Sequence, residues 1–346
     1  MDIGIDSFAA ILPDPETGTL PSAADRMHNL LAEVETADRV GLDVFGIGEH
    51  HRPEFLDSAP AIILAAAAAR TTQIRLSSAV TVLSAADPVR VFQEFATLDL
   101  ISKGRAEIVV GRGSFGEAFP LFGLDPNAYD DIFAEKLDLF LKLGETSNPT
   151  WQGRFRSALT GQGIFPRPYQ KRLPVWLGVG GTPQSFIRAG RLGLPLMIAI
   201  IGGSFEGFRP LVDLYRHSGV SAGHDPKMLK VGVHAVGFVG RSDEEARTSY
   251  FPGWHQLFGK IGRERGWAAP TRDQFDHMAG SDGAYLIGSP ETVAAKMLRA
   301  SDTLGGLSRM TLQMTSASLE TGAMLQSIEL LGKEVAPIIR SVRSRA

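Results

Sequence analysis

Residues 174–201 read PVWLGVGGTPQSFIRAGRLGLPLMIAII, and this stretch decides the fold. The segments 174–179 and 194–201 are apolar at nearly every position, which is typical of parallel strands that are buried on both faces. Between them, Thr182-Pro183 offers an N-cap residue and a proline at the first position of a helix predicted over 183–192. The stretch is therefore predicted to be a strand–helix–strand unit.

The same rhythm runs along the whole chain. Strands are predicted over 3–5, 44–47, 74–82, 106–110, 174–179, 194–201, 230–239 and 310–314, and helices over 25–40, 60–70, from 87, over 132–143, 183–192 and 205–218, from 242, from 289, and over 319–333. Eight strand–helix pairs favour a parallel α/β fold, and we expect one (β/α)8 TIM-barrel domain over 1–346. An open doubly wound sheet is the alternative, but the loop 7–20 lacks the G-x-G-x-x-G typical of that fold.

Two connections are longer than a barrel needs, namely 114–173 after the fourth strand and 240–308 after the seventh. Loops of this length are usually functional, and loops that follow barrel strands lie on the active face. Both segments are candidate lids; insertions at a subunit interface are the alternative.

Composition excludes several classes of function. The chain has no cysteine, so disulfides, thiolate metal sites and thiol nucleophiles are absent. A net charge of −3 gives no reason to expect a nucleic-acid or membrane partner. The longest apolar runs, 61–69 and 194–201, are too short to span a bilayer, and the first residues do not resemble a secretory signal. We therefore expect a cytoplasmic protein.

Glu49-His50-His51 follows the second predicted strand, where barrel enzymes place catalytic groups. Adjacent side chains on an extended chain point in opposite directions, so one histidine is expected to face the pocket. The alternative is a pair of histidines that only fix the loop. A metal site would need several converging ligands, and the other histidines are scattered, so no metal site is predicted.

Two glycine-containing segments could hold a phosphate. Gly111-Arg112-Gly113-Ser114 offers a guanidinium beside accessible backbone, and Gly180-Gly181-Thr182 with Ser185 opens a helix whose first amides can bind an anion. Each segment alone could be an ordinary turn. Neither is a Walker loop, because Gly-Lys-Ser/Thr is missing. The small residues of 77–82 leave room for a flat ring, although taken alone they are better explained by an ordinary barrel core.

Taken in order, these motifs resemble the bacterial luciferase family of flavin-dependent monooxygenases. The matching pieces are Gly41-Leu42-Asp43 before Glu49-His50-His51, Asp87-Pro88-Val89-Arg90, the run LDLISKGR at 98–105 before Gly111-Arg112-Gly113, Phe122-Gly123-Leu124-Asp125, Pro174-Val175-Trp176 and Gly193-Leu194-Pro195. They extend over more than half of the chain.

The resemblance implies a TIM barrel that uses reduced FMN, supplied by a separate reductase, and O2 to oxidise a small organic substrate. His50 matches the family's catalytic histidine, and Glu49 beside it is the second catalytic candidate. The other matches imply cofactor contacts: Ala79 and Val80, often joined by a cis peptide and followed by Thr81; Arg112 and Ser114; and Gly180, Gly181, Thr182 and Ser185. Family members are often homodimers.

Two departures from the family limit what is implied. Asp130 stands where the luciferases have a second phosphate-binding arginine, and Gly111 stands where they have a cysteine. Light emission is therefore not implied. A deazaflavin (F420)-dependent hydride-transfer enzyme and a non-catalytic flavin-binding protein remain the alternative functions.

Overall fold

The computed structural model describes residues 1–14, 17–315 and 319–343. Its parallel strands form a nearly closed barrel in the order β3–β2–β1–β12–β10–β9–β8–β5–β4. A parallel bridge between Leu76 on β3 and Ala106, just before β5, brings the two sides of this order together. The TIM-barrel prediction is thus confirmed. The barrel strands are β1 (Asp2–Ser7), β2 (Val44–Ile47), β3 (Arg75–Ser78), β4 (Thr81–Val82), β5 (Ile108–Gly111), β8 (Val175–Val179), β9 (Leu196–Ile200), β10 (Val231–Val239) and β12 (Arg309–Gln313).

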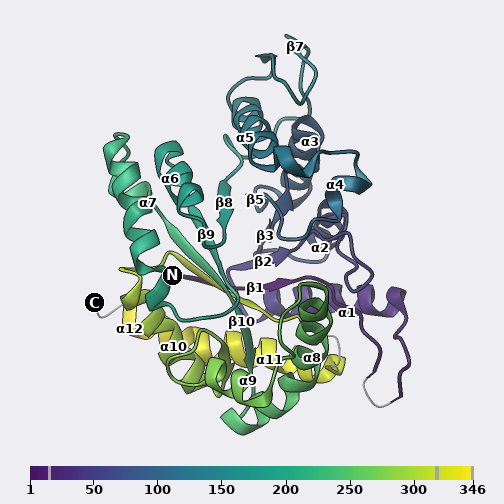
Figure 1. The fold of residues 1–346 in the computed structure, drawn as a ribbon, viewed down its shortest axis with the longest axis vertical. Coiled ribbons are helices and arrows are strands. Elements are labelled where there is room, and N and C mark those ends of the chain that lie inside the picture. Colours follow the sequence, from purple (N-terminus) through teal and green to yellow (C-terminus); the bar gives the residue numbers. More distant parts are fainter. Residues whose placement is uncertain (15–16, 316–318, 344–346) are drawn as a thin grey trace.

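Helices surround the barrel (Figure 1). Several begin at side-chain caps: Ser22, Asp87 and Ser289 each accept hydrogen bonds from amides of the following turn. The helices are α1 (Ala23–Arg39), α2 (Pro60–Ala68), α3 (Pro88–Ser102), α4 (Ala118–Leu121), α5 (Tyr129–Glu145), α6 (Pro183–Leu192), α7 (Arg209–Ser221), α8 (Asp243–Glu264), α9 (Arg272–Ala279), α10 (Pro290–Thr303), α11 (Thr321–Leu330) and α12 (Ala336–Arg343).

The strand predicted over 74–82 is two strands. β3 pairs with β2, the chain then passes through a cis peptide bond between Ala79 and Val80, and β4 pairs with β5. Periodicity could not reveal this interruption, because all of these residues have the composition of one strand.

The connection 240–308 is mostly helical and contains α8, α9 and α10. It also adds β11 (Leu286–Gly288), which pairs parallel with the end of β10 and which the sequence analysis missed because three residues carry too little pattern. The connection 114–173 contains α4, α5 and a hairpin of β6 (Thr150–Trp151) and β7 (Leu159–Thr160), which projects at one end of the molecule (Figure 1).

The closing helix begins at Thr321 rather than at residue 319, and it does not end at residue 333. A π-helical turn, Leu331–Val335, leads directly into α12. Gly332 lies in this turn, where an added Cβ would meet the Val40 side chain at 2.3 Å, so a glycine permits close packing against the end of α1. In the described part of the chain, no helix is long and apolar enough to cross a membrane.

Candidate active site

A cavity of about 480 Å³ opens at the carboxyl ends of the barrel strands and reaches down between them. Its depth is shown by Val44 and Arg309, which stand at the amino ends of β2 and β12 and still contribute to the wall. On the floor, Arg309 donates to Glu107 and to Asp2, and its guanidinium lies 4.4 Å from the centre of the Trp176 ring. This paired cation closes the lower end of the barrel.

Both long connections contribute to the cavity wall. The first supplies Ser114, Phe115 and Tyr129, and the second supplies Leu257, Phe258 and Ile261 on α8, followed by Arg265 and Trp267. Arg265 donates to the Ser114 carbonyl at 3.0 Å and covers the Phe115 ring at 4.8 Å. The two segments therefore meet above the barrel.

His50 lines this cavity, whereas His51 does not. The Nδ1 atom of His50 lies 2.8 Å from Asp57 Oδ2, and its backbone amide donates to Asp57 Oδ1 at 3.1 Å. Asp57 is fully buried; burial raises the pKa of this carboxyl, and the hydrogen bond from His50 opposes that shift. Because the carboxylate occupies Nδ1, the other ring nitrogen is left to exchange a proton with a ligand.

Aromatic rings surround His50 and fix its plane. The centres of the Phe8, Phe55 and Phe115 rings lie 4.5, 4.6 and 5.4 Å from the centre of the imidazole. The sequence analysis missed both this enclosure and Asp57. A carboxylate seven residues after the histidine was the available signal, but nothing in the spacing showed that the loop folds back.

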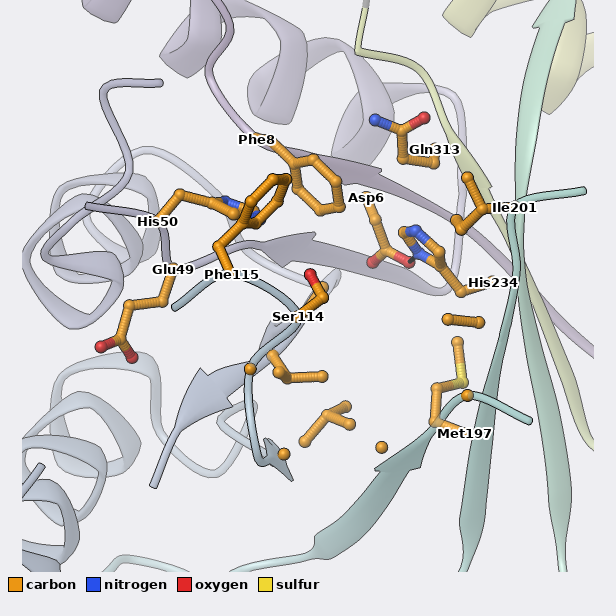
Figure 2. A pocket seen from close by; sticks show the side chains of 18 of the residues that line it. Asp6, Phe8, Glu49, His50, Ser114, Phe115, Met197, Ile201, His234 and Gln313 are labelled. Atoms are coloured by element: carbon orange, nitrogen blue, oxygen red, sulfur yellow. Dashed lines mark hydrogen bonds and ion pairs between the residues drawn. The ribbon is translucent and has the colours of Figure 1, made fainter. Parts of the chain in front are cut away.

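Glu49 also lines the cavity, yet its carboxylate is engaged elsewhere. Oε2 accepts from the Val82 amide at 2.8 Å, and Oε1 lies 3.3 Å from Nε2 of His51. Figure 2 shows the carboxylate pointing away from Phe8, Asp6 and His234. This geometry suits a residue that holds β4 in place better than one that transfers protons in the cavity.

Ala79 and Val80 lie in the wall, and two glycines make room for the Val80 side chain. An added Cβ at Gly111 would lie 2.6 Å from it, and one at Gly178 would lie 2.7 Å from it. Thr81 is buried outside the wall, and in the described structure its hydroxyl has no hydrogen-bond partner. The glycine at 111, where the resembling family has cysteine, is thus required by the packing of Val80.

The two predicted phosphate segments converge. Arg112 Nη2 donates to Thr182 Oγ1 at 3.5 Å, and Arg112, Gly180 and Thr182 all face the cavity together with Ser114. Thr182 is the N-cap residue of α6, but its side chain makes no cap hydrogen bond. Pro183 has no N–H and the Ser185 amide donates to the Thr182 carbonyl, so the Gln184 amide is left without a side-chain acceptor at the start of the helix. An amide in this position favours an anion.

Three predicted contacts are less direct. Gly181 is exposed but does not belong to the wall, and Ser185 is buried one turn into α6, where its amide donates to the Thr182 carbonyl. Arg112 is also ion-paired with Asp130, an exposed residue of the first turn of α5. Asp130, which stands where the resembling family has a second phosphate-binding arginine, therefore already neutralises Arg112.

A second buried polar cluster was not anticipated. His234 on β10 places Nδ1 2.5 Å from Asp6 Oδ2 on β1, and the same oxygen accepts from the Thr311 hydroxyl on β12. All three residues line the cavity. Within the described ranges, no group of three histidine, aspartate or glutamate residues is arranged to hold a metal ion.

Comparison with known proteins agrees with this architecture. Limonene 1,2-monooxygenase of Rhodococcus erythropolis is 26% identical over 346 residues, which cover 97% of this chain and 87% of that protein. Three solved structures superpose over 98% of this chain and 99% of their own. Monooxygenase RslO1 from Streptomyces bottropensis has a TM-score of 0.84 and 23% identity, and the oxygenating constituent of 3,6-diketocamphane monooxygenase from Pseudomonas putida, which is a type II Baeyer–Villiger enzyme in complex with FMN, has a TM-score of 0.77 and 20% identity. An F420-dependent secondary alcohol dehydrogenase with an F420–acetone adduct has a TM-score of 0.76 and 18% identity.

These structures show a shared fold. The family assignment rests on the sequence, because the sequence model of the luciferase-like monooxygenase family matches residues 1–306, which is most of the chain. This chain therefore belongs to the luciferase-like monooxygenase family.

Proposed function

We propose that the protein is an FMN-dependent monooxygenase that binds reduced FMN in the cavity and oxidises a small organic substrate with O2. One observation carries the proposal: Arg112 and the uncapped start of α6 meet at the same cavity that His50 lines. An anionic tail and a reactive ring would each find a suitable partner there.

The donor set fits FMN. The phosphate would accept hydrogen bonds from Arg112, Ser114, Thr182 and the amides that follow Gly180 and Gly181, and the ring would lie against Ala79 and Val80. Thr81 and Ser185 would support these contacts from behind the wall. Reduced FMN, when bound, would supply the electrons that activate O2. His50 would hold or transfer the proton at Nε2, and Glu49 would keep the wall in place.

The phosphate contact can be tested without a substrate. Titration with FMN, followed by quenching of flavin fluorescence, measures its affinity, and riboflavin is the matched ligand that lacks the phosphate. We expect Arg112→Ala to weaken FMN by about tenfold or more and to leave riboflavin within twofold, since a charge-assisted hydrogen bond contributes about 1.5–3 kcal/mol. Equal losses for both ligands, or no FMN binding by the wild type, would contradict the proposal.

The role of His50 needs a turnover assay. A panel of cyclic ketones, alcohols and aldehydes, supplied with reduced FMN under air and analysed by mass spectrometry, identifies a compound that the wild type oxidises. His50→Ala is expected to lower that turnover by about 10²-fold or more while FMN affinity stays within twofold. His51→Ala, which removes a histidine outside the cavity, is the control.

The deazaflavin-dependent function is the second candidate, favoured by the superposition on an F420 enzyme. Titration of the wild type with F420 beside FMN separates the two, and preference for F420 would reverse the proposal. Binding of oxidised FMN without any O2-dependent substrate loss would instead favour a flavin-binding protein.

We also propose that a separate reductase supplies reduced FMN, as the resemblance to the flavin-dependent monooxygenases of this family implies. A homodimer in the cytoplasm completes the proposal. Leu100 and Ile101 in the last turn of α3 are neighbouring exposed apolar residues that a subunit contact could cover. Sedimentation of the purified chain would measure the assembly.

A further inference from the structure

The proposed function leaves one buried group of the cavity without a role, namely the pair formed by His234 and Asp6. Asp6 Oδ2 accepts the hydroxyl hydrogen of Thr311, so the carboxylate acts as an acceptor, and the Nδ1–H of His234 donates to it at 2.5 Å. Among the described residues, none makes a hydrogen bond to the other ring nitrogen, Nε2. Because His234 belongs to the cavity wall, this nitrogen is the polar atom that the pair can offer to a ligand.

The imidazole is held in one orientation. The Phe8 ring stacks on it with centres 5.7 Å apart and an angle of 18° between the planes. Figure 2 shows the His234 ring and the Asp6 carboxylate facing one another, with Phe8 beside them. A ring fixed on one nitrogen by a carboxylate and on one face by an aromatic side chain is preorganised to bind through the other nitrogen.

The barrel makes space for this pair. Gly46 on β2 faces Asp6, and a Cβ added there would lie 2.1 Å from Asp6 Oδ1. Barrel interiors are usually filled by layers of large branched side chains. In this layer the chain instead has a glycine and a buried carboxylate that supports a histidine.

The pair lies away from the proposed phosphate contacts. Those contacts follow β5 and β8, whereas Asp6, Thr311 and His234 come from β1, β12 and β10. Ala79, against which the ring is proposed to lie, is nearer: a Cβ added at Gly46 would lie 2.9 Å from the Ala79 Cβ and 2.1 Å from Asp6 Oδ1. The pair therefore borders the place proposed for the ring. The wall beside the pair is mainly apolar and includes Phe8, Met197, Ile201 and Leu257, and Gln313 on β12 adds one neutral amide (Figure 2). The floor cation Arg309 is already paired with Glu107 and Asp2, so this side gives no reason to expect an anionic ligand.

We propose that His234 is a substrate-binding residue, and that the substrate is a neutral, mainly apolar molecule whose hydroxyl or carbonyl oxygen is held by Nε2. The imidazole can accept from a hydroxyl or, when protonated, donate to a carbonyl. The inference rests on the proposed function, because it names the class of molecule that the enzyme would oxidise. The apolar body would fill the chamber between Phe8, Met197 and Leu257.

The test uses the flavin-free protein and three probes of similar size: cyclohexanol, cyclohexanone and methylcyclohexane. In protein labelled with ¹⁵N-histidine, cyclohexanol or cyclohexanone is expected to shift the Nε2 resonance of His234, whereas methylcyclohexane does not. His234→Phe keeps an aromatic ring beside Phe8 but removes the nitrogen. We expect it to weaken the oxygenated probe about tenfold while methylcyclohexane changes less than twofold.

His255→Phe is the control, because His255 is exposed on α8 and is not part of the wall; it should change none of the three affinities. If His234→Phe fails to fold, His234→Leu, which also removes the nitrogen, repeats the test, with the midpoint of thermal unfolding as the check of folding. Equal losses for all three probes, absence of the Nε2 shift, or displacement of the bound probe by FMN would overturn the inference. If the wild type does not bind FMN but the three probes behave as expected, only the proposed cofactor is wrong, and the role of His234 stands.

Discussion

Two histidines of the cavity wall, His50 and His234, are each held by a carboxylate, and the two pairs are built in different ways. His50 and Asp57 are seven residues apart in one loop after β2, whereas His234 and Asp6 are 228 residues apart and stand on two barrel strands. In both pairs Nδ1 meets the carboxylate, and Phe8 packs against both rings. A loop can adjust its position around a ligand, while a strand position is fixed by the barrel; this difference suggests proton transfer for the first pair and substrate placement for the second.

The largest effect is expected from a substitution that breaks the His50–Asp57 pair. In Asp57→Asn the amide cannot hold the His50 ring in the same protonation state, so we expect turnover of the panel compound to fall about 10²-fold at unchanged FMN affinity. Asp6→Asn is the matched change in the second pair and should mainly raise KM. If Asp57→Asn and Asp6→Asn change kcat and KM in the same proportions, the two pairs do not have different roles.

The next largest effect is expected from a substitution that fills the space beside the His234–Asp6 pair. Gly46→Ala would force Asp6 out of its position, because the new Cβ would lie 2.1 Å from its carboxylate. We expect a loss of about 1–3 kcal/mol in the free energy of unfolding, measured with urea. Gly144→Ala on α5 is the control: no atom would lie within 4 Å of its Cβ, and a more stable helix is expected there. An undiminished stability of Gly46→Ala would contradict the tight fit.

Lys296 on α10 sharpens the comparison, because it is a buried base for which the described residues place no carboxylate within ion-pair distance. Its Nζ donates to the carbonyls of Ala279 and Gly280, and burial, reinforced by Arg299 and Arg247, lowers its pKa to about 7. Between pH 7 and about 10 the unfolded chain therefore binds more protons than the folded one, so stability rises with pH in this window.

The expected contribution is at most about 1.4 kcal/mol per pH unit, and Lys296→Met should remove it from the pH dependence of urea unfolding. Lys333→Met, at an exposed lysine paired with Glu329, is the control and should leave the slope unchanged. Parallel curves for the wild type and Lys296→Met would show that Lys296 titrates normally.

The smallest effect is expected at Arg112, in the part of the cavity proposed to hold the phosphate. Asp130 neutralises Arg112, so Asp130→Asn should free the guanidinium and tighten FMN about three- to fivefold, with riboflavin unchanged. Asp131→Asn is the neighbouring control, because Asp131 lies 3.9 Å from Arg154 and does not pair with Arg112. Weaker FMN binding in Asp130→Asn would mean that Asp130 positions the arginine rather than competing for it.

The sequence by itself determined the barrel, because apolar strands, capped helices and glycine turns are local patterns that repeat along the chain. It also indicated Glu49-His50-His51 and the Arg112 and Thr182 segments, since each stands directly after a strand whose carboxyl end must open on the active face. Only the tertiary structure joined His234 to Asp6, paired Arg112 with Asp130, and turned the Glu49 carboxylate toward Val82. Those contacts depend on strand register and on how loops fold back. Neither leaves a periodic signal in one sequence, because residues 18, 33 or 228 positions apart become neighbours only when the loops fold back and the ring of strands closes.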